Sequence, residues 1–185
     1  MSKAILALAG RRDLPPGDDL IDQIIAQWGA VAPELDTEAM QVIGRVMRIG
    51  EALSAQAADA VAPFGLSYSE FDILVTMRRA GPPYRRTPSQ IGNAVLLTSG
   101  AITAALDRLT DRGLLSRVSD PSDRRVRAAQ LTDKGVELSY QAAKARFEAA
   151  RRSLATFEPA EQRRLTVSLK ALTRALRDAP HDDDE

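Results

Sequence analysis

The sequence predicts a mainly α-helical chain that carries one small β-hairpin. Apolar residues recur at the three- and four-residue spacing of amphipathic helices over most of the chain. Capping signals and glycine–proline breaks separate these helical stretches from one another. Only residues 114–118 and 126–131 have the pattern of strands, and Asp, Pro and Ser residues typical of a turn lie between them. We therefore expect several helices packed around a single hairpin.

Each predicted helix has its own start and stop signals. A first helix is expected from about residue 18 to residue 28, and a longer one over residues 36–62. Ser67 and Glu70 form a capping box that opens the next helix, which ends before Gly81. The remaining helices are expected over residues 88–95, 98–112, 133–154 and 158–178.

Composition excludes several classes of protein. The chain has 185 residues, of which 44% are apolar and 27% are charged, as in ordinary globular domains. Cysteine is absent, which excludes disulfides and thiol chemistry, and the one histidine, His181, stands in an acidic tail. A Ser-His-Asp site or a metal site is therefore not expected, and no pair of acidic residues has a recognisable catalytic spacing. We expect a protein that is not an enzyme and uses no metal or cofactor.

The two ends of the chain lack a regular pattern. Residues 1–17 are expected to form a loose leader, and residues 179–185 an acidic tail that frays. The longest apolar stretch near the start, residues 4–9, is too short to span a membrane. Two arginines follow it, where a signal peptide would have a small-residue cleavage site. We expect a cytoplasmic protein.

Charge is balanced overall but unevenly distributed. Lys plus Arg and Asp plus Glu both number 25. Residues 78–127, however, contain ten arginines and four aspartates, a local charge of +6 that leaves −6 for the rest of the chain. A basic middle flanked by acidic arms is typical of a segment that meets a polyanion such as nucleic acid.

The order of elements in this basic segment predicts a winged helix-turn-helix. The helices over residues 88–95 and 98–112 form the helix-turn-helix, and the hairpin after them forms the wing. In that arrangement the second helix enters the DNA major groove, where small hydroxyl side chains contact phosphates and bases. A core of three helices with a solvated arginine-rich edge would produce the same features. The residues predicted to contact DNA are Thr98, Ser99, Thr103 and Arg108 on the helix, and Arg124, Arg125 and Arg127 on the wing.

These motifs resemble the winged helix-turn-helix of the MarR family. The resemblance rests on residues 97–103, 106–109 and 113–115, and on the wing and its junction with the next helix, 120–125 and 131–135. It extends over about residues 38–178. It implies a dimeric repressor whose terminal helices form helical dimerisation arms. It also implies that Arg125 enters the minor groove at the wing tip and that Asp123 holds Arg125 in place.

The N-terminal extension is similar to the urate-responsive branch of that family. The resemblance implies a pocket for a small aromatic anion formed by Trp28, Asp72, Arg79 and Arg117, with Arg117 paired to Asp72. Residues 72 and 79 are two helical turns apart and so project on one side of their helix. The chain departs from the branch at Ala105, where an arginine is usual, and at Ala104, where a polar residue is usual. The same residues would equally serve as a core anchor and a structural ion-pair cluster.

The predicted domains follow from these assignments. Residues 18–62 are expected to form the ligand pocket wall and part of the dimer, residues 63–132 the DNA-binding domain, and residues 133–178 the C-terminal dimerisation helices. The apolar rows of the terminal helices need a partner, which a second copy or the protomer's own long helices would provide. We expect a regulator that binds a pseudopalindromic operator as a homodimer and is released by a urate-like or phenolic anion. A DNA-binding regulator or architectural protein without an effector is the alternative.

Overall fold

The computed structural model describes residues 17–95, 98–119 and 127–179. The chain divides into two compact units, residues 1–146 and 147–185, and each is considered by itself. The predicted leader and acidic tail lie almost entirely outside the described residues. Of the helices described, none is long and apolar enough to cross a membrane.

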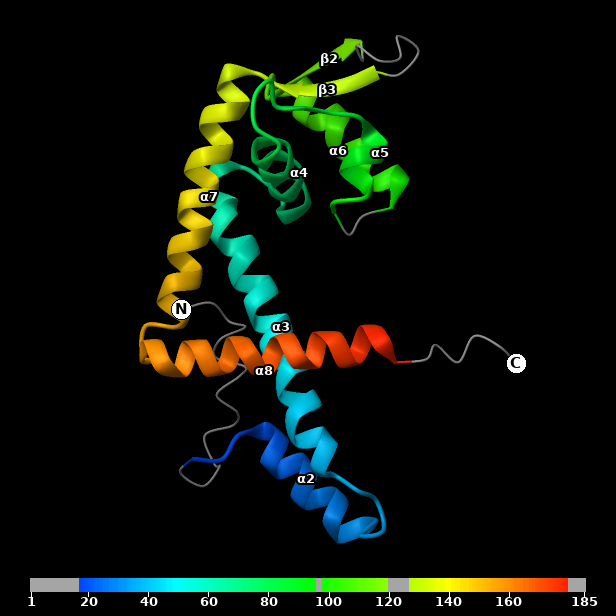
Figure 1. Ribbon diagram of the computed structural model, residues 1–185, viewed down its shortest axis with the longest axis vertical. Helices are drawn as coiled ribbons and strands as arrows, with labels where there is room; N and C mark the ends of the chain where they lie inside the picture. The colour runs from blue at the N-terminus through cyan, green and yellow to red at the C-terminus, as the bar shows by residue number, and fades with distance from the viewer. Residues whose placement is uncertain (1–16, 96–97, 120–126, 180–185) are drawn as a thin grey trace, which may run out of the picture. The chain divides into compact units, whose positions relative to one another are not determined.

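The observed elements confirm the predicted order of helices and strands (Figure 1). The largest differences at the ends are three residues: α2 extends to Val31 instead of residue 28, and the short helix of the helix-turn-helix stops at Gly92 instead of residue 95. The helices of the first unit are α2 (Leu20–Val31), α3 (Glu38–Val61), η1 (Ala62–Phe64), α4 (Tyr68–Arg79), α5 (Pro88–Gly92), α6 (Ser99–Asp111) and α7 (Asp133–Ser153), which continues into the second unit.

Side-chain caps define the starts of the helices. Ser67 and Glu70 form the predicted capping box of α4, and Thr87 with Gln90 forms the same motif at α5. Between α3 and α4 the chain turns at Gly65, whose φ of 66° is in the left-handed region that favours glycine. This short connection places the start of α4 directly after the end of α3.

The sheet has one more strand than the sequence predicts. Strands β2 (Leu115–Ser119) and β3 (Arg127–Leu131) pair antiparallel as the expected hairpin, and β1 (Arg85–Arg86) joins the other edge of β3. A strand of two residues has no periodicity to detect, so only its tertiary pairing reveals it. The side chain of Arg85 also donates to Gln130 Oε1 on β3, at 3.0 Å from Nη2.

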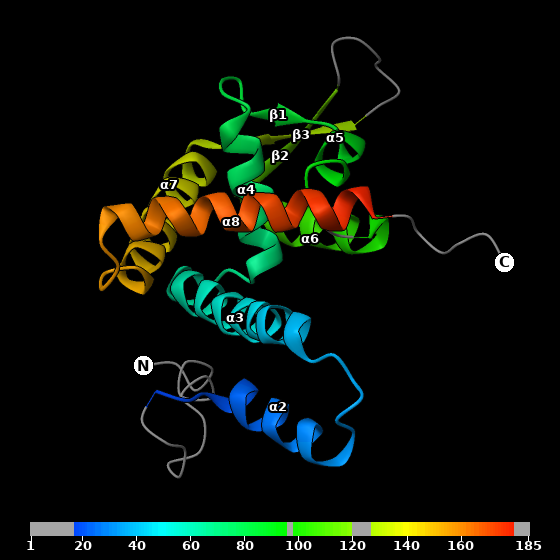
Figure 2. The ribbon, with the colours of Figure 1, turned by 60° about the horizontal axis from the view of Figure 1, so that its bottom comes forward.

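One apolar core holds α4, α5, α6 and the sheet together. Ile73, Leu74 and Met77 of α4 are fully buried against Leu106 and Leu109 of α6. The core continues through Ile91 of α5, Leu114, Leu115, Ala129 and Leu131 of the hairpin, and Ala142 of α7. Figure 2 shows α4, α5 and α6 gathered beside the three strands.

The start of α7 lies against the loop that leads into the hairpin. A Cβ on Gly135 would overlap the carbonyl oxygen of Leu114, so this close approach requires glycine. The Thr132 hydroxyl donates to the Gly113 carbonyl at 2.8 Å and accepts from the Gly135 N–H at 3.1 Å. The predicted Thr132–Asp133 start of the long helix is thus confirmed.

Helix α2 packs on the N-terminal half of α3. Ile21 lies on Gly44, whose missing side chain makes room for it. Arg45 of α3 donates to the carboxylates of Asp19 and Asp22 at 2.8 and 2.6 Å. Three apolar residues of α3, Val42, Ile49 and Leu53, are by contrast exposed within this chain.

The second unit contains the end of α7 and the helix α8 (Pro159–Asp178). Glu158 and Glu161 form a capping box at the start of α8. None of the residues of α8 is buried, and its leucines at positions 165, 169 and 176 are exposed. An apolar row on a helix is stable in water only when another surface covers it.

Candidate nucleic-acid interface and ligand site

The exposed side of α6 consists of small polar residues, as the sequence predicts. Thr98 is the N-cap, and its hydroxyl oxygen accepts from the backbone N–H of Ala101 at 3.3 Å. The Thr103 hydroxyl donates to the Ser99 carbonyl at 3.1 Å, which leaves its oxygen lone pairs toward solvent. Ser99 is exposed in the first turn. A duplex facing this side would meet hydroxyl groups close to the positive end of the helix dipole.

The opposite side of α6 is buried and fixes the helix. Ile102, Leu106 and Leu109 enter the core, as predicted. Ala105 is 1% exposed and lies among them, whereas Ala104 is exposed. An arginine in place of Ala105 would have to bury its guanidinium in this core, which is costly without a partner. The departure from the urate-responsive pattern is therefore compatible with the packing of α6.

Arg108 forms an ion pair that the sequence did not predict. Its Nε donates to Glu70 Oε1 on α4 at 3.0 Å, although 56% of the Arg108 side chain remains exposed. Burial by itself would raise the pKa of Glu70. Hydrogen bonds from the Ser67 backbone, the Arg108 guanidinium and the Ser67 hydroxyl outweigh burial and hold that pKa below its usual value. Glu70 is therefore an ionised anchor at neutral pH.

The wing is described only along its strands. Arg127 is exposed on β3, opposite Ser119. Arg124 and Arg125, together with Asp123, lie outside the described residues. The expected contact between Asp123 and Arg125 therefore stays a prediction.

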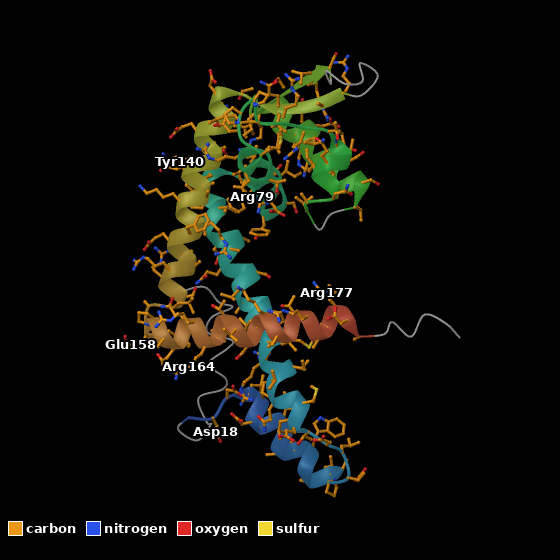
Figure 3. All side chains as sticks on the ribbon, viewed as in Figure 1. Asp18, Arg79, Tyr140, Glu158, Arg164 and Arg177 are labelled. Atoms are coloured by element: carbon orange, nitrogen blue, oxygen red, sulfur yellow. The ribbon has the colours of Figure 1, made fainter. Side chains whose placement is uncertain are left out.

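Two of the four predicted ligand residues lie near each other. Asp72 and Arg79 both project from α4, and the positive charge of Arg79 acts on the Asp72 carboxylate. Burial of that carboxylate is the stronger effect and raises the pKa of Asp72 above its usual value. Arg79 donates through Nη2 to the Thr76 hydroxyl at 2.8 Å and is labelled in Figure 3.

The other two predicted ligand residues have neighbours that the sequence did not predict, and the expected pairing of Arg117 with Asp72 is wrong. Arg117 Nη2 donates to Asp107 on α6 at 2.6 Å, so its carboxylate partner is Asp107 and not Asp72. The reason is local: β2 packs on α6, which brings residue 117 beside the exposed edge of that helix. Trp28 is 50% exposed on α2, which contacts the N-terminal half of α3, whereas α4 follows the other end of α3. The described part of one protomer does not bring all four residues together.

A surface hollow of about 460 Å³ lies beside Arg79. Its position between the end of α4, β1 and α5 could not be inferred from sequence, because β1 is too short to predict. In the sequence, the one feature that indicates this hollow is the pair Arg85 and Arg86 before the Thr87 capping box. The hollow is lined by Thr76, Arg79, Ala80, Arg86, Gln90, Asn93 and Ala94. Two guanidinium groups and two amides make this lining suitable for an anion.

The fold and the exposed face of α6 define a winged helix-turn-helix protein. Comparison with known proteins identifies the family to which it belongs. A family model described as MarR family matches residues 64–126. The HTH-type transcriptional regulator PecS of Dickeya dadantii (strain 3937) is 36% identical over 156 residues, which cover 84% of this chain and 94% of PecS. The chain therefore belongs to the MarR family of DNA-binding transcriptional regulators.

Solved structures agree on the fold. A MarR variant from E. coli complexed with operator DNA has a TM-score of 0.61 and 20% identity, over 78% of this chain and 96% of that chain. BpsR of Bordetella bronchiseptica, whose DNA binding is regulated by 6-hydroxynicotinic acid, has a TM-score of 0.61 and 22% identity, over 79% of this chain and 98% of that chain. At these identities the likeness shows the shared fold.

The raised pKa of Asp72 predicts the effect of neutralising it. At pH values above the native-state pKa of Asp72, burial of the ionised carboxylate lowers the free energy of unfolding. Below the ordinary aspartate pKa the carboxyl is protonated in both states, so this loss of stability is absent. Asp72→Asn should therefore raise the unfolding temperature at pH 7 by about 2 °C. The gain should vanish near a pH of about 3. Thermal denaturation at both pH values tests this, with the exposed Asp111→Asn as control; a variant less stable than wild type at pH 7 would contradict it.

Proposed function

We propose that this chain is a repressor that binds a pseudopalindromic operator as a homodimer and is released by a small aromatic anion. In this proposal residues 63–132 bind DNA, residues 18–62 and 133–178 contribute the dimer arms, and the hollow beside Arg79 receives the anion. The observation that carries the proposal is the division of α6 into a buried apolar side and an exposed hydroxyl-bearing side next to a basic hairpin.

The exposed side of α6 supports major-groove reading. The Thr98 hydroxyl accepts a hydrogen bond within the helix, so its own proton is available to a phosphate oxygen. The Thr103 hydroxyl has the reverse arrangement: it donates within the helix, so its oxygen is available to a base amino group. These two side chains and Ser99 thus offer both donor and acceptor groups to a duplex.

The wing supports a second contact with the same duplex. Arg127 is exposed at the start of β3, directly after the segment that carries Arg124 and Arg125 in the sequence. Arginines favour the minor groove because its negative potential is concentrated there. Each phosphate neutralised by such a residue also releases counterions, which makes the binding dependent on salt.

Removing a wing arginine should weaken DNA binding in a salt-dependent way. For Arg127→Ala we expect about three- to tenfold lower affinity for a fragment from upstream of the chain's own gene. The slope of log affinity against log salt should fall by about one unit. Fluorescence anisotropy at several salt concentrations measures both values. Arg164→Ala on α8 removes the same charge and should leave the slope unchanged; an unchanged slope for Arg127→Ala would exclude the wing contact.

The unpartnered apolar rows support a homodimer. Leu169 and Leu176 on α8 are 44% and 61% exposed, and Phe147 at the start of the second unit is 76% exposed. On α3, Met47 and Ile49 are also exposed. Apolar surface of this extent is rarely left in water, and two identical chains bury it in pairs through a two-fold axis.

A charge on the leucine row of α8 should disrupt the dimer. We expect Leu169→Glu to shift the chain from a dimer to a monomer, because two copies would have to bury the new carboxylates. Val167 is also exposed and lies roughly 160° around the helix from Leu169, at about 100° per residue. Val167→Glu is therefore the matched control and should remain dimeric. Light scattering after size-exclusion chromatography measures the mass; a wild-type monomer would refute the dimer.

The hollow beside Arg79 supports the anion site. Arg79 and Arg86 bring two positive charges to one concavity, and Gln90 and Asn93 add amide groups. The half-buried Asp72 lies on the same helix as Arg79. A ligand releases DNA only if it binds more tightly to a conformer whose recognition helices are wrongly spaced for the operator.

Arg79 should be required for the response to the anion. We expect 6-hydroxynicotinic acid, salicylate or urate to raise the unfolding temperature of the wild-type chain by mass action and to release it from DNA. In Arg79→Ala both effects should weaken by at least about tenfold in ligand concentration, because a charge-assisted contact is lost. Arg177→Ala is the control. Trp28→Ala tests a residue that lies apart from the hollow within one protomer. A lost response in this variant would indicate that a second copy supplies Trp28 to the site.

A DNA-binding regulator without an effector is the second candidate. It is favoured by the Arg117–Asp107 ion pair and by the position of α2, which together leave the expected four-residue pocket incomplete. If none of these acids changes the unfolding temperature or the DNA affinity of the wild-type chain, this candidate replaces the ligand-responsive one.

A further inference from the structure

We infer that Glu70 is a positioning residue for DNA binding: its buried carboxylate orients the Arg108 guanidinium toward a phosphate and fixes α6 to the junction between α3 and α4. This inference rests on the proposed binding of DNA by α6. It concerns a residue of α4 that the duplex itself would not touch.

Glu70 joins the start of α4 to α6 through one carboxylate. Its side chain is 8% exposed. One oxygen, Oε2, accepts from the Ser67 backbone N–H at 3.0 Å and so completes the cap of α4. The other oxygen, Oε1, accepts from Arg108 Nε on α6 at 3.0 Å. A capping box requires only the first of these contacts, so the second is additional to the cap.

The way in which Arg108 is held points to a positioning role. In the described contacts only the Nε of Arg108 bonds to Glu70, and more than half of the Arg108 side chain stays exposed. The two terminal nitrogens of the guanidinium are therefore available on the flank of α6. Because the guanidinium is planar, a hydrogen bond at Nε fixes the direction of the remaining N–H donors. The contact with Glu70 thus turns Arg108 from a flexible surface side chain into an oriented hydrogen-bond donor for a phosphate.

Arg112 extends the same link to the end of α3. Its Nη1 donates to the Gly65 carbonyl at 2.9 Å and lies 3.7 Å from Glu70 Oε2. Its Nη2 donates to the Phe64 carbonyl at 3.4 Å. The C-terminal end of α6 is thus tied to the turn that joins α3 to α4. A change in the direction of α3 would be passed to α6 through these contacts.

The test uses Glu70→Gln, which keeps the cap and removes the charge, since glutamine also serves at this position of a capping box. We expect Glu70→Gln to bind operator DNA about tenfold more weakly and to lose about one unit of salt slope, and we expect the same of Arg108→Ala. The variant carries one more net positive charge, which by itself would strengthen DNA binding, so a loss cannot come from overall charge. Glu137→Gln on α7 makes the same charge change and should bind like wild type.

Two further variants separate orientation from stability. In Arg108→Ala, adding Glu70→Gln should cause no further loss of affinity, because Glu70 acts through Arg108. Arg108→Lys keeps the charge but lacks a fork that can hold Glu70 and a phosphate together, so it should bind within about twofold of Arg108→Ala. Since Arg108 is largely exposed, Arg108→Ala and Arg108→Lys are informative even if Glu70→Gln unfolds.

The outcomes are distinct. Additive losses in the double variant, an unchanged salt slope in Glu70→Gln, or wild-type affinity for Arg108→Lys would each overturn the positioning role. Failure of the wild-type chain to bind its upstream DNA at any salt concentration would instead overturn the proposed function.

Discussion

One side of α6 is buried against α4 and the hairpin, and the arrangement of the winged helix-turn-helix follows from this packing. Leu106 and Leu109 have no accessible surface, and Ile73, Leu74 and Met77 of α4 enclose them. Replacing either leucine by alanine would cost about 2–5 kcal/mol by the usual measure for buried leucines. Because this packing fixes the rotation of α6 about its axis, it also decides which residues face outward. The polar face is a consequence of the core.

Electrostatic contacts refine the position that the core sets. Glu70 connects α4 to α6, and Arg78 of α4 donates to the Val136 carbonyl of α7 at 2.6 Å. Arg78 also lies 5.0 Å from the ring centre of Tyr140, which Figure 3 labels on α7. These contacts join the ends of helices that belong to different parts of the fold. Helix α6 is thereby connected, through α4, to the start of α7.

The ion pairs also show why sequence likeness misplaces individual contacts. Asp72, Arg79 and Arg117 match a known pattern by position, but Arg117 bonds to Asp107, its nearest carboxylate across the α6–β2 packing. An arginine side chain is long and pairs with whichever acid the local packing brings within reach. The choice between Asp72 and Asp107 depends on distances in space. The spacing of residues along the sequence gives no information about these distances.

The helices, their caps, the hairpin and the polar side of α6 could all be predicted from the amino-acid sequence. These features depend on short-range chemistry: the Ser67–Glu70 box, the Thr98 cap and the spacing of Ile102, Leu106 and Leu109 act within one or two helical turns. The strand at Arg85–Arg86, the partners of Arg108 and Arg117, and the separation of α2 from α4 depend on how the chain folds in space. The residues that pair in these features are 10 to 45 positions apart in the chain, and the folded core brings them together.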